Sequence, residues 1–426
     1  MRVWPRGGLW RHPDFLRLWS AQTVSQFGSQ VSQLALPLAA ILVLDASAFE
    51  VALLGTVEFL PFLLFALPAG VWVDRLRRKP ILVLGDLGRA VALASVPLAY
   101  AFDALTIWQL YAVGFLVGVC TVFFDVAYQS YLPSLVDRSQ LVDGNSKLEV
   151  SRSGAALAGP GLAGALIGAV TAPYAILLDA VSFLASAGLV LRIRRAEPLP
   201  EPTAKPSMRR ELVEGLRYLL GHRFWRPLAV TVALSNFFNT LAFSIFLVYA
   251  VRQLDLSAAL IGLVLGVGNV GWLLGAVAAN RLSARLGVGL TLVGSAMVFG
   301  PALLLVPAAP QSQPIPFIVV ALILASFAGI VFNVTGLSFQ QAVTPDRLLG
   351  RLNATRRFIV WGVIPLGSLA GGALASLIGL RPTLWVGAIG GSLSFLPLLF
   401  SPVRSIGPME EAVLEHSQVV AEVPDA

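Results

Sequence analysis

The chain is poor in cysteine and histidine. Its 426 residues include one cysteine, Cys120, and three histidines, His12, His222 and His416. A single thiol excludes an intramolecular disulfide framework, a thiolate zinc cluster and a CxxC redox pair. The three histidines stand in polar segments at the start, middle and end of the chain, which is a poor basis for a shared ligand site. We therefore predict no metal, no cofactor and no enzymatic activity.

Charged residues are also scarce. They make up 12% of the chain, while 57% of the residues are hydrophobic; soluble domains carry roughly 25% charged residues. A chain this apolar would expose a large hydrophobic surface in water, so it is predicted to be a polytopic membrane protein. The net charge of +7 would favour a nucleic-acid partner in a soluble protein. In a membrane protein it reports which loops carry the positive residues, and no nucleic-acid partner is expected.

Twelve apolar runs are long enough to cross a bilayer, for which about 20 residues are needed. They cover approximately residues 19–44, 50–73, 80–102, 105–130, 148–170, 172–192, 226–251, 257–280, 286–308, 314–338, 355–379 and 381–402. The first run is too long, and too polar in its middle, for a cleaved signal sequence, so it should remain as the first helix. The predicted fold is an all-α membrane protein with twelve transmembrane helices in the cell membrane.

Basic residues are concentrated on one set of loops. When the loops are numbered alternately from the N-terminus, 27 of the 30 lysines and arginines fall on the side of both termini. Only Arg252 and Arg381 fall on the other side, and Arg89 lies inside the third run. By the positive-inside rule, both termini are predicted to be cytoplasmic.

The longest polar stretch divides the chain near its middle. Residues 193–225 contain a proline-rich segment followed by a short run of leucines that would share one helical face. We interpret this stretch as a cytoplasmic linker with an amphipathic surface helix. It separates an N-terminal six-helix half at 1–192 from a C-terminal six-helix half at 226–403, and a cytoplasmic tail follows at 404–426.

The two halves carry related segments at a nearly constant spacing. An Asp-Arg-Leu segment beginning at Asp74 matches an Asn-Arg-Leu segment at Asn280, at an offset of 206 residues. An Asp-Arg pair at Asp137 matches a pair at Asp346, at an offset of 209. Such a duplication favours two parallel halves with a binding site near the middle of the membrane, as in alternating access.

Two motifs resemble the major facilitator superfamily. Gly70-x-x-x-Asp74-Arg75-x-x-Arg78-Lys79, between the second and third runs, resembles its loop signature. Gly154-x(4)-Gly159-Pro160-x-x-x-Gly164, in the fifth run, resembles the motif of its antiporter and exporter branches. Further phrases, such as Phe15-Leu16-Arg17-Leu18-Trp19, are similar to the branch that holds macrolide effluxers and enterobactin-type siderophore exporters.

The resemblance implies a gate at these motifs. Asp74 would cap the N-terminus of the eleventh helix or pair with Arg356 or Arg357. For the individual basic residues at 77–79, the alternative interpretation is a topology anchor that holds the loop on the cytoplasmic side. Arg77 stands where the signature usually has glycine, and Asn280 replaces the acid in the second half, so the gate should be dominated by the first half. The predicted gate residues are Gly70, Asp74, Arg75, Arg78, Gly154, Gly159, Pro160, Gly164 and Arg356.

Five ionisable residues are expected inside the first-half spans, namely Glu58, Asp86, Arg89, Asp125 and Asp179. Such groups are costly in a bilayer and serve a pathway, a relay or a pair. Asp86 and Arg89 are three residues apart and can pair on one helical face, where Asp125 can join them in a structural network. Asp179 fits helix packing equally well. Glu58 has no basic neighbour, so it can either carry a proton or stay neutral and hydrogen-bonded to the first or eleventh helix.

Polar side chains recur every three to four residues along the first run. Such a stripe must face a cavity or partner helices. Together with amides and aromatic rings of other spans, it predicts an amphipathic central cavity for bulky, mostly apolar ligands. The candidate lining residues are Gln22, Gln26, Gln30, Gln33, Phe59, Asn236, Asn239, Asn269, Asn333 and Trp361.

Small residues predict a close contact between the fifth and eighth runs. Pro160 kinks the fifth run, and the pairs Gly262 with Gly266 and Gly271 with Gly275 make the eighth run its expected partner. The contact could seal and part as the halves move. Ordinary glycine-mediated packing is the alternative interpretation.

The leading functional hypothesis is secondary-active export of an amphipathic small molecule, such as a drug, a macrolide or a siderophore-like metabolite, in exchange for protons. The expected partners of this monomer are its small-molecule substrate, protons and the lipid bilayer. An uptake symporter of the same fold is disfavoured by the Gly159-Pro160 motif. A polytopic membrane enzyme would need clustered acidic or histidine motifs at one membrane face, and a non-transporting sensor stays open.

Overall fold

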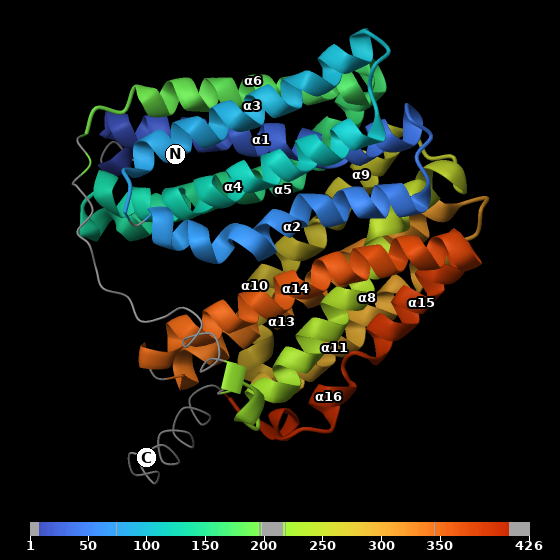
Figure 1. Ribbon diagram of the computed structural model, residues 1–426. Coiled ribbons are helices and arrows are strands. Elements are labelled where there is room, and N and C mark those ends of the chain that lie inside the picture. Colours follow the sequence, from blue (N-terminus) through green and yellow to red (C-terminus); the bar gives the residue numbers. More distant parts are fainter. Residues whose placement is uncertain are drawn as a thin grey trace, which may run out of the picture. The chain divides into compact units, whose positions relative to one another are not determined.

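The computed structural model describes residues 8–73, 75–195, 197, 216–217, 219–344 and 346–408. The regular secondary structure of these residues is entirely helical (Figure 1). The chain divides into two compact units, one formed by Met1–Ala204 with Ala250–Gly266 and the other by Lys205–Tyr249 with Val267–Ala426. They are called unit 1 and unit 2 below.

Unit 1 is built on the helices of the first half of the sequence. These are α1 (Pro13–Leu42), α2 (Ala48–Val73), α3 (Arg78–Ala101), α4 (Ile107–Leu135), α5 (Leu141–Val170) and α6 (Ala172–Leu191). Helix α6 packs against both α1 and α3, α4 packs against α2 and α3, and α1 packs against α5 (Figure 1). The unit also contains most of α9 (Ala258–Gly268).

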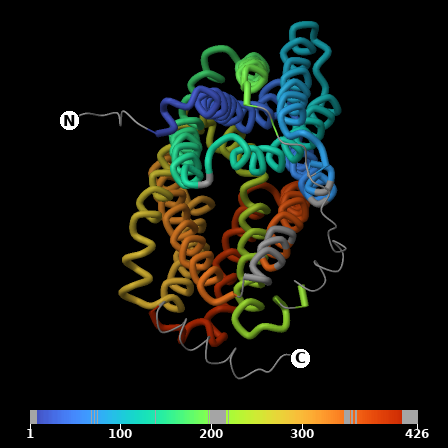
Figure 2. Tube along the Cα trace, turned by 90° about the vertical axis from the view of Figure 1, so that its left-hand side faces the viewer, coloured from blue at the N-terminus to red at the C-terminus, as the bar shows by residue number. Residues whose placement is uncertain are grey.

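Unit 2 is built on the helices of the second half. These are α8 (Trp225–Arg252), α10 (Val270–Leu286), α11 (Val288–Leu303), α12 (Leu305–Ala308), α13 (Pro314–Val343), α14 (Asp346–Ile378), α15 (Leu380–Leu393) and α16 (Leu396–Leu399). Helix α13 packs against α10 and α11, and α15 packs against α11 and α14. Figure 2 shows the yellow to orange tubes of α10, α11 and α13 running alongside one another.

Eleven stretches of the described residues are long and apolar enough to cross a membrane. Helix α1 has 30 residues but is not among them, because its glutamines and serines lower its mean hydropathy. The predicted all-α fold is confirmed. The count of twelve spans and the cytoplasmic termini stay predictions.

Three helices begin well before the apolar runs that predicted them. Helix α5 begins at Leu141, whereas its apolar run begins near residue 148. The added turns carry an ion pair between Asp143 and Lys147, and a second pair, between Glu149 and Arg152, lies at the start of the apolar run. Pairs at these spacings stabilise a helix outside the apolar span, where hydropathy gives no signal. Helix α1 likewise begins at Pro13, ahead of residue 19, and helix α14 begins at Asp346, ahead of residue 355.

The predicted linker at 193–225 lies mostly outside the described residues. Of its leucines, Leu219 is buried in the core of unit 2 with Trp225 and Leu228, whereas Leu216 and Leu220 are exposed. The described end of the linker is therefore anchored to unit 2 through the apolar side chains of Leu219, Phe224 and Trp225.

Candidate functional site

A buried ion pair lies inside unit 1 among α3, α4 and α6. Asp86 and Arg89 of α3 are 0% and 5% exposed, and 2.5 Å separates Asp86 Oδ1 from Arg89 Nη2. The guanidinium carbon lies 4.2 Å from the ring centre of Phe124 in α4 and 4.1 Å from that of Phe183 in α6. A cation between two aromatic faces is attracted to both. Arg89 thus neutralises a buried acid and joins three helices.

Asp179 of α6 lies at the contact with α1. It is 1% exposed, and its Oδ1 accepts a hydrogen bond from Ser182 Oγ at 3.0 Å. Opposite stands Gly28 of α1, where a Cβ would come within 2.7 Å of Ser182 Cβ and would also meet the Asp179 carboxylate. Arg89 attracts this carboxylate as well. Asp179 therefore belongs to the same charge cluster and requires a glycine on α1.

Asp125 of α4 occupies a different environment. It is exposed on the surface of unit 1, although Arg89 attracts its carboxylate. It forms no hydrogen bond or ion pair with the residues that the structure describes. Asp125 therefore lies beside the Asp86–Arg89 pair without closing a bonded network with it.

Glu58 of α2 lies against α4. A Cβ on Gly114 would stand 2.9 Å from Glu58 Cγ, and a Cβ on Gly118 would stand 2.7 Å from the Glu58 carbonyl oxygen. The two glycines therefore leave the space that Glu58 fills. No cation or hydrogen-bond donor of the described chain contacts its carboxyl group. The sequence left open a neutral Glu58 that is hydrogen-bonded to the first helix, and the described residues show no such hydrogen bond.

Helices α5 and α9 approach each other at two glycines within unit 1. A Cβ on Gly164 would stand 2.9 Å from Gly262 Cα, and a Cβ on Gly262 would overlap the Pro160 carbonyl oxygen. Gly154, by contrast, has no atom within 4 Å of an added Cβ. The close approach predicted for the fifth and eighth spans is therefore present at Gly164. Its role as a gate stays a prediction.

Replacing Gly164 with alanine is expected to lower the transport rate by about fivefold or more, since overpacking costs roughly 1 to 3 kcal/mol. The matched control is Gly168→Ala, because a Cβ at Gly168 would meet Ala259 Cβ at an ordinary distance of 3.7 Å. The measurement is the initial rate of ligand transport in membrane vesicles, normalised to the amount of protein. Equal rates for the two variants would show that the contact is not needed for transport.

The polar stripe of α1 runs from the interior of unit 1 to its surface. Gln22 is 5% exposed, and its Nε2 has no hydrogen-bond partner among the described residues. Gln30 packs on Gly159 of α5, where an added Cβ would lie 2.6 Å from Gln30 Cβ. Gln26 is partly exposed and Gln33 is exposed. The α5 motif therefore touches the stripe directly, at Gly159.

Unit 2 repeats this helix contact. Gly367 of α14 stands 208 residues after Gly159. A Cβ on Gly367 would lie 2.6 Å from the Phe237 carbonyl oxygen and 3.1 Å from Thr240 Cβ, both in α8. Helix α14 thus packs on α8 as α5 packs on α1. The offset lies between the 206 and 209 residues of the sequence repeats, which supports the duplication.

The remaining cavity candidates differ in environment. Asn236 Nδ2 donates to the Val232 carbonyl oxygen at 2.8 Å, within α8. Asn269 lies between α9 and α10, where the helix is interrupted. Asn333 is exposed, while Asn239 and Trp361 are partly exposed. Phe59 is 42% exposed, and its ring centre lies 5.9 Å from that of Phe62. A common cavity for these residues stays a prediction.

The loop signature is only partly described. Asp74 lies outside the described residues, Arg75 is exposed, and Gly70 has no atom within 4 Å of an added Cβ. Arg356 lies in α14 and is partly exposed. The proposed capping by Asp74 therefore stays a prediction.

Glu197 caps the first turn of α3. It accepts hydrogen bonds from the Arg78 amide at 2.8 Å and the Lys79 amide at 3.2 Å, and its Oε1 lies 3.3 Å from Arg78 Nη1. Free amides at a helix N-terminus favour a carboxylate partner. Sequence reasoning missed Glu197, because 119 residues separate it from Arg78 and no local pattern links the two.

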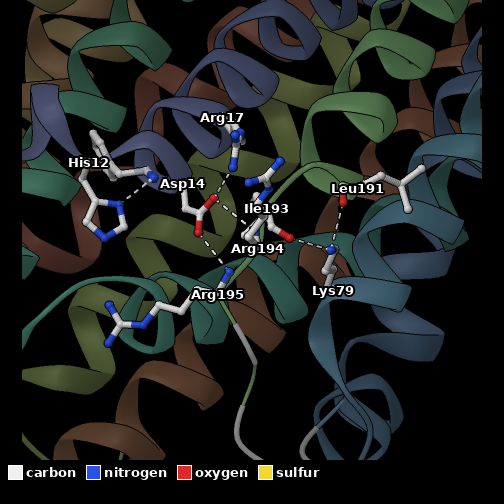
Figure 3. Close-up of polar contacts among 9 residues, drawn as sticks. His12, Asp14, Arg17, Lys79, Leu191, Ile193, Arg194 and Arg195 are labelled. Carbon is white, nitrogen blue, oxygen red and sulfur yellow. Dashed lines mark hydrogen bonds and ion pairs between the residues drawn. The ribbon is translucent and has the colours of Figure 1, made fainter.

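Asp14, at the start of α1, binds the segment that follows α6 and that also contains Glu197. Its carboxylate accepts hydrogen bonds from the amides of Arg194 at 3.1 Å and Arg195 at 2.9 Å, and it pairs with Arg17 at 2.5 Å (Figure 3). Burial alone would raise the pKa of Asp14, but these two amides and Arg17 together lower it below its usual value. Asp14 therefore holds the chain that follows α6 as a charged acceptor.

Known proteins match this chain over most of its length. The sequence profile of the Major Facilitator Superfamily matches residues 18–359. The multidrug efflux pump Tap of Mycolicibacterium fortuitum is 26% identical over 388 residues, which cover 88% of this chain and 91% of that protein. Macrolide efflux protein A of Streptococcus pyogenes is 25% identical over 374 residues, which cover 86% and 90%.

Solved structures share the fold of this chain. A bacterial homologue of the iron transporter ferroportin, in its inward-facing state, aligns with a TM-score of 0.74 at 18% identity, covering 92% of this chain and 99% of that one. At that identity the likeness shows the fold alone. The sequence match and the helical fold together show that the chain is a multi-pass membrane protein that belongs to the major facilitator superfamily of transporters.

Proposed function

We propose that the protein exports amphipathic small molecules, such as macrolides and other drugs, in exchange for protons by alternating access. Two efflux proteins of the same family match about nine-tenths of their own length to this chain, and this supports the direction and the substrate class. Identity near 25% leaves the particular substrate open, because a few side chains in a cavity decide it.

The placement of Glu58 carries the proposal of proton coupling. In a membrane helix, a carboxyl group with no cation beside it is least costly when it is protonated and neutral. Asp86, in contrast, already has Arg89 as its counter-ion at 2.5 Å. Glu58 can therefore take up and release a proton without breaking an ion pair, and unlike the exposed Asp125 it packs against a neighbouring helix.

The contact between α5 and α9 supports alternating access. Helix α5 comes from the first half of the sequence and α9 from the second, and they meet at Gly164 and Gly262 through backbone atoms. Parting such a contact breaks no ion pair and exposes little apolar side chain. This makes it suited to open and close repeatedly during transport.

A pH gradient, acid inside, is expected to drive accumulation of a radiolabelled macrolide in inverted membrane vesicles that contain the protein. Nigericin, which dissipates the gradient, should reduce accumulation to the level of vesicles that lack the protein. Accumulation that persists without the gradient would contradict proton antiport. Gradient-driven depletion instead of accumulation would favour an uptake symporter of the same fold.

A further inference from the structure

A small cavity lined by basic side chains lies in unit 1 where α6 ends and α3 begins. Its volume is about 240 Å³. Four of its lining residues are basic, namely Arg77, Lys79, Arg194 and Arg195, and Glu197 is the single acid. Pro80 and Ile193 complete the wall. We call this cavity the basic pocket.

The backbone of the basic pocket is fixed by polar contacts. Lys79 Nζ donates to the carbonyl oxygens of Leu191 at 3.0 Å and Ile193 at 2.7 Å (Figure 3). Asp14 holds the amides of Arg194 and Arg195 on the other side of the segment (Figure 3). These contacts therefore hold the backbone at the α6 end of the pocket in place.

The pocket carries an excess of positive charge with unused hydrogen-bond donors. The Glu197 carboxylate already accepts two amides of α3, and Arg195 Nη1 donates to the Leu135 carbonyl oxygen at 2.6 Å. The guanidinium groups of Arg77 and Arg194 are exposed and form no hydrogen bond or ion pair with other described residues. Each guanidinium offers five donors, so these two side chains can bind an added anion.

Phosphate is the anion that suits this arrangement. A guanidinium group binds phosphate oxygens through two parallel hydrogen bonds. A volume of about 240 Å³ is many times the roughly 10 to 15 Å³ that one water molecule needs on the same measure. The basic pocket is therefore large enough for a phosphate group and the atoms next to it.

The position of the pocket favours a lipid as the source of the phosphate. Helices α3 and α6 are both long and apolar enough to span a membrane, and the pocket lies at the ends they share. Headgroups lie at that depth, and the basic loops predict that this face is cytoplasmic, where anionic lipids attract Lys and Arg. We propose that the basic pocket binds the phosphate of an anionic lipid headgroup.

Such binding would act on the connection between the halves of the sequence. Arg194 and Arg195 are among the first residues after α6, and their amides are tied to Asp14 in α1. A bound headgroup would tie the start of the linker to the membrane surface as well.

The test is equilibrium binding of fluorescent dioctanoyl-phosphatidylglycerol to the full chain in detergent. The double variant Arg77→Gln/Arg194→Gln is expected to bind about tenfold more weakly or worse, because it loses two charge-assisted contacts. The matched control is Arg281→Gln/Arg285→Gln, which removes two exposed positive charges from the end of α10, outside the pocket. The unfolding midpoint of each lipid-free variant checks that the fold is kept.

Competition by other probes identifies the source of the phosphate. Weak competition by inorganic phosphate and by dioctanoyl-phosphatidylcholine supports an anionic lipid site. Tight binding of inorganic phosphate that also needs Arg77 and Arg194 supports the phosphate site and makes free phosphate its source. Equal affinity in the wild type and the pocket double variant, or an equal loss in the control, overturns the proposal.

Discussion

Replacing Arg89 with methionine is expected to destabilise the protein by about 3 to 5 kcal/mol, because it leaves a buried carboxylate without its cation. Asp86 is 0% exposed, and Arg89 is its ion-pair partner at 2.5 Å. The rings of Phe124 and Phe183 would also lose the guanidinium that lies between them. The measurement is the unfolding midpoint in detergent, together with the amount of protein in the membrane.

The double variant Asp86→Leu/Arg89→Met separates the ion pair from the ring contacts. If the lost stability comes from the unpaired carboxylate, the double variant should recover most of it, since an apolar pair often replaces a buried ion pair at little cost. A double variant as unstable as Arg89→Met would assign the stability to Phe124 and Phe183 instead.

An exposed ion pair provides the matched control. Glu149 and Arg152 on α5 are three residues apart, as Asp86 and Arg89 are. The distance from Arg152 Nη2 to Glu149 Oε1 is 2.6 Å, and the Arg152 and Glu149 side chains are 55% and 53% exposed. Arg152→Met should cost less than about 1 kcal/mol, because exposed pairs contribute little. A similar loss for Arg152→Met and Arg89→Met would mean that burial is not what makes Asp86 dependent on its partner.

Contacts marked by a local or periodic pattern were predictable from the sequence. The spacing of three residues between Asp86 and Arg89 indicated their pairing, and apolar runs located the helices to within a few residues at most ends. Glycines at regular spacing indicated the approach of α5 and α9, which the structure places at Gly164 and Gly262. These signals are local or periodic, so one sequence contains them.

Contacts that leave no local or periodic pattern in the sequence were not predictable. Glu197 caps α3 from 119 residues away, and Asp14 binds the amide of Arg194 from 180 residues away. Both depend on where helix ends meet in space, and neither leaves a periodic pattern. The stripe on α1 shows the same limit. Gln22 and Gln33 belong to one sequence pattern, but Gln22 is buried and Gln33 is exposed because the neighbours of α1 change along its length.

Replacing Glu58 with glutamine is expected to lower gradient-driven accumulation by at least about tenfold, because the variant cannot release a proton. Glutamine has nearly the same shape, so it should fit the space that Gly114 and Gly118 leave on α4. Exchange of labelled for unlabelled ligand without a gradient should continue, since it needs no net proton movement. Both measurements use the same inverted vesicles.

Asp125→Asn is the comparison that assigns the proton-carrying acid. Asp125 is also an acid of unit 1 without a bonded cation in the described chain, but it is exposed on α4, whereas Glu58 lies against that helix. If Glu58→Gln accumulates ligand at the wild-type rate and Asp125→Asn does not, the proton moves through α4 and our assignment is wrong. If both lose accumulation but keep exchange, the two acids act in sequence. Loss of exchange in Glu58→Gln would instead place Glu58 in ligand binding or in the packing of α2 on α4.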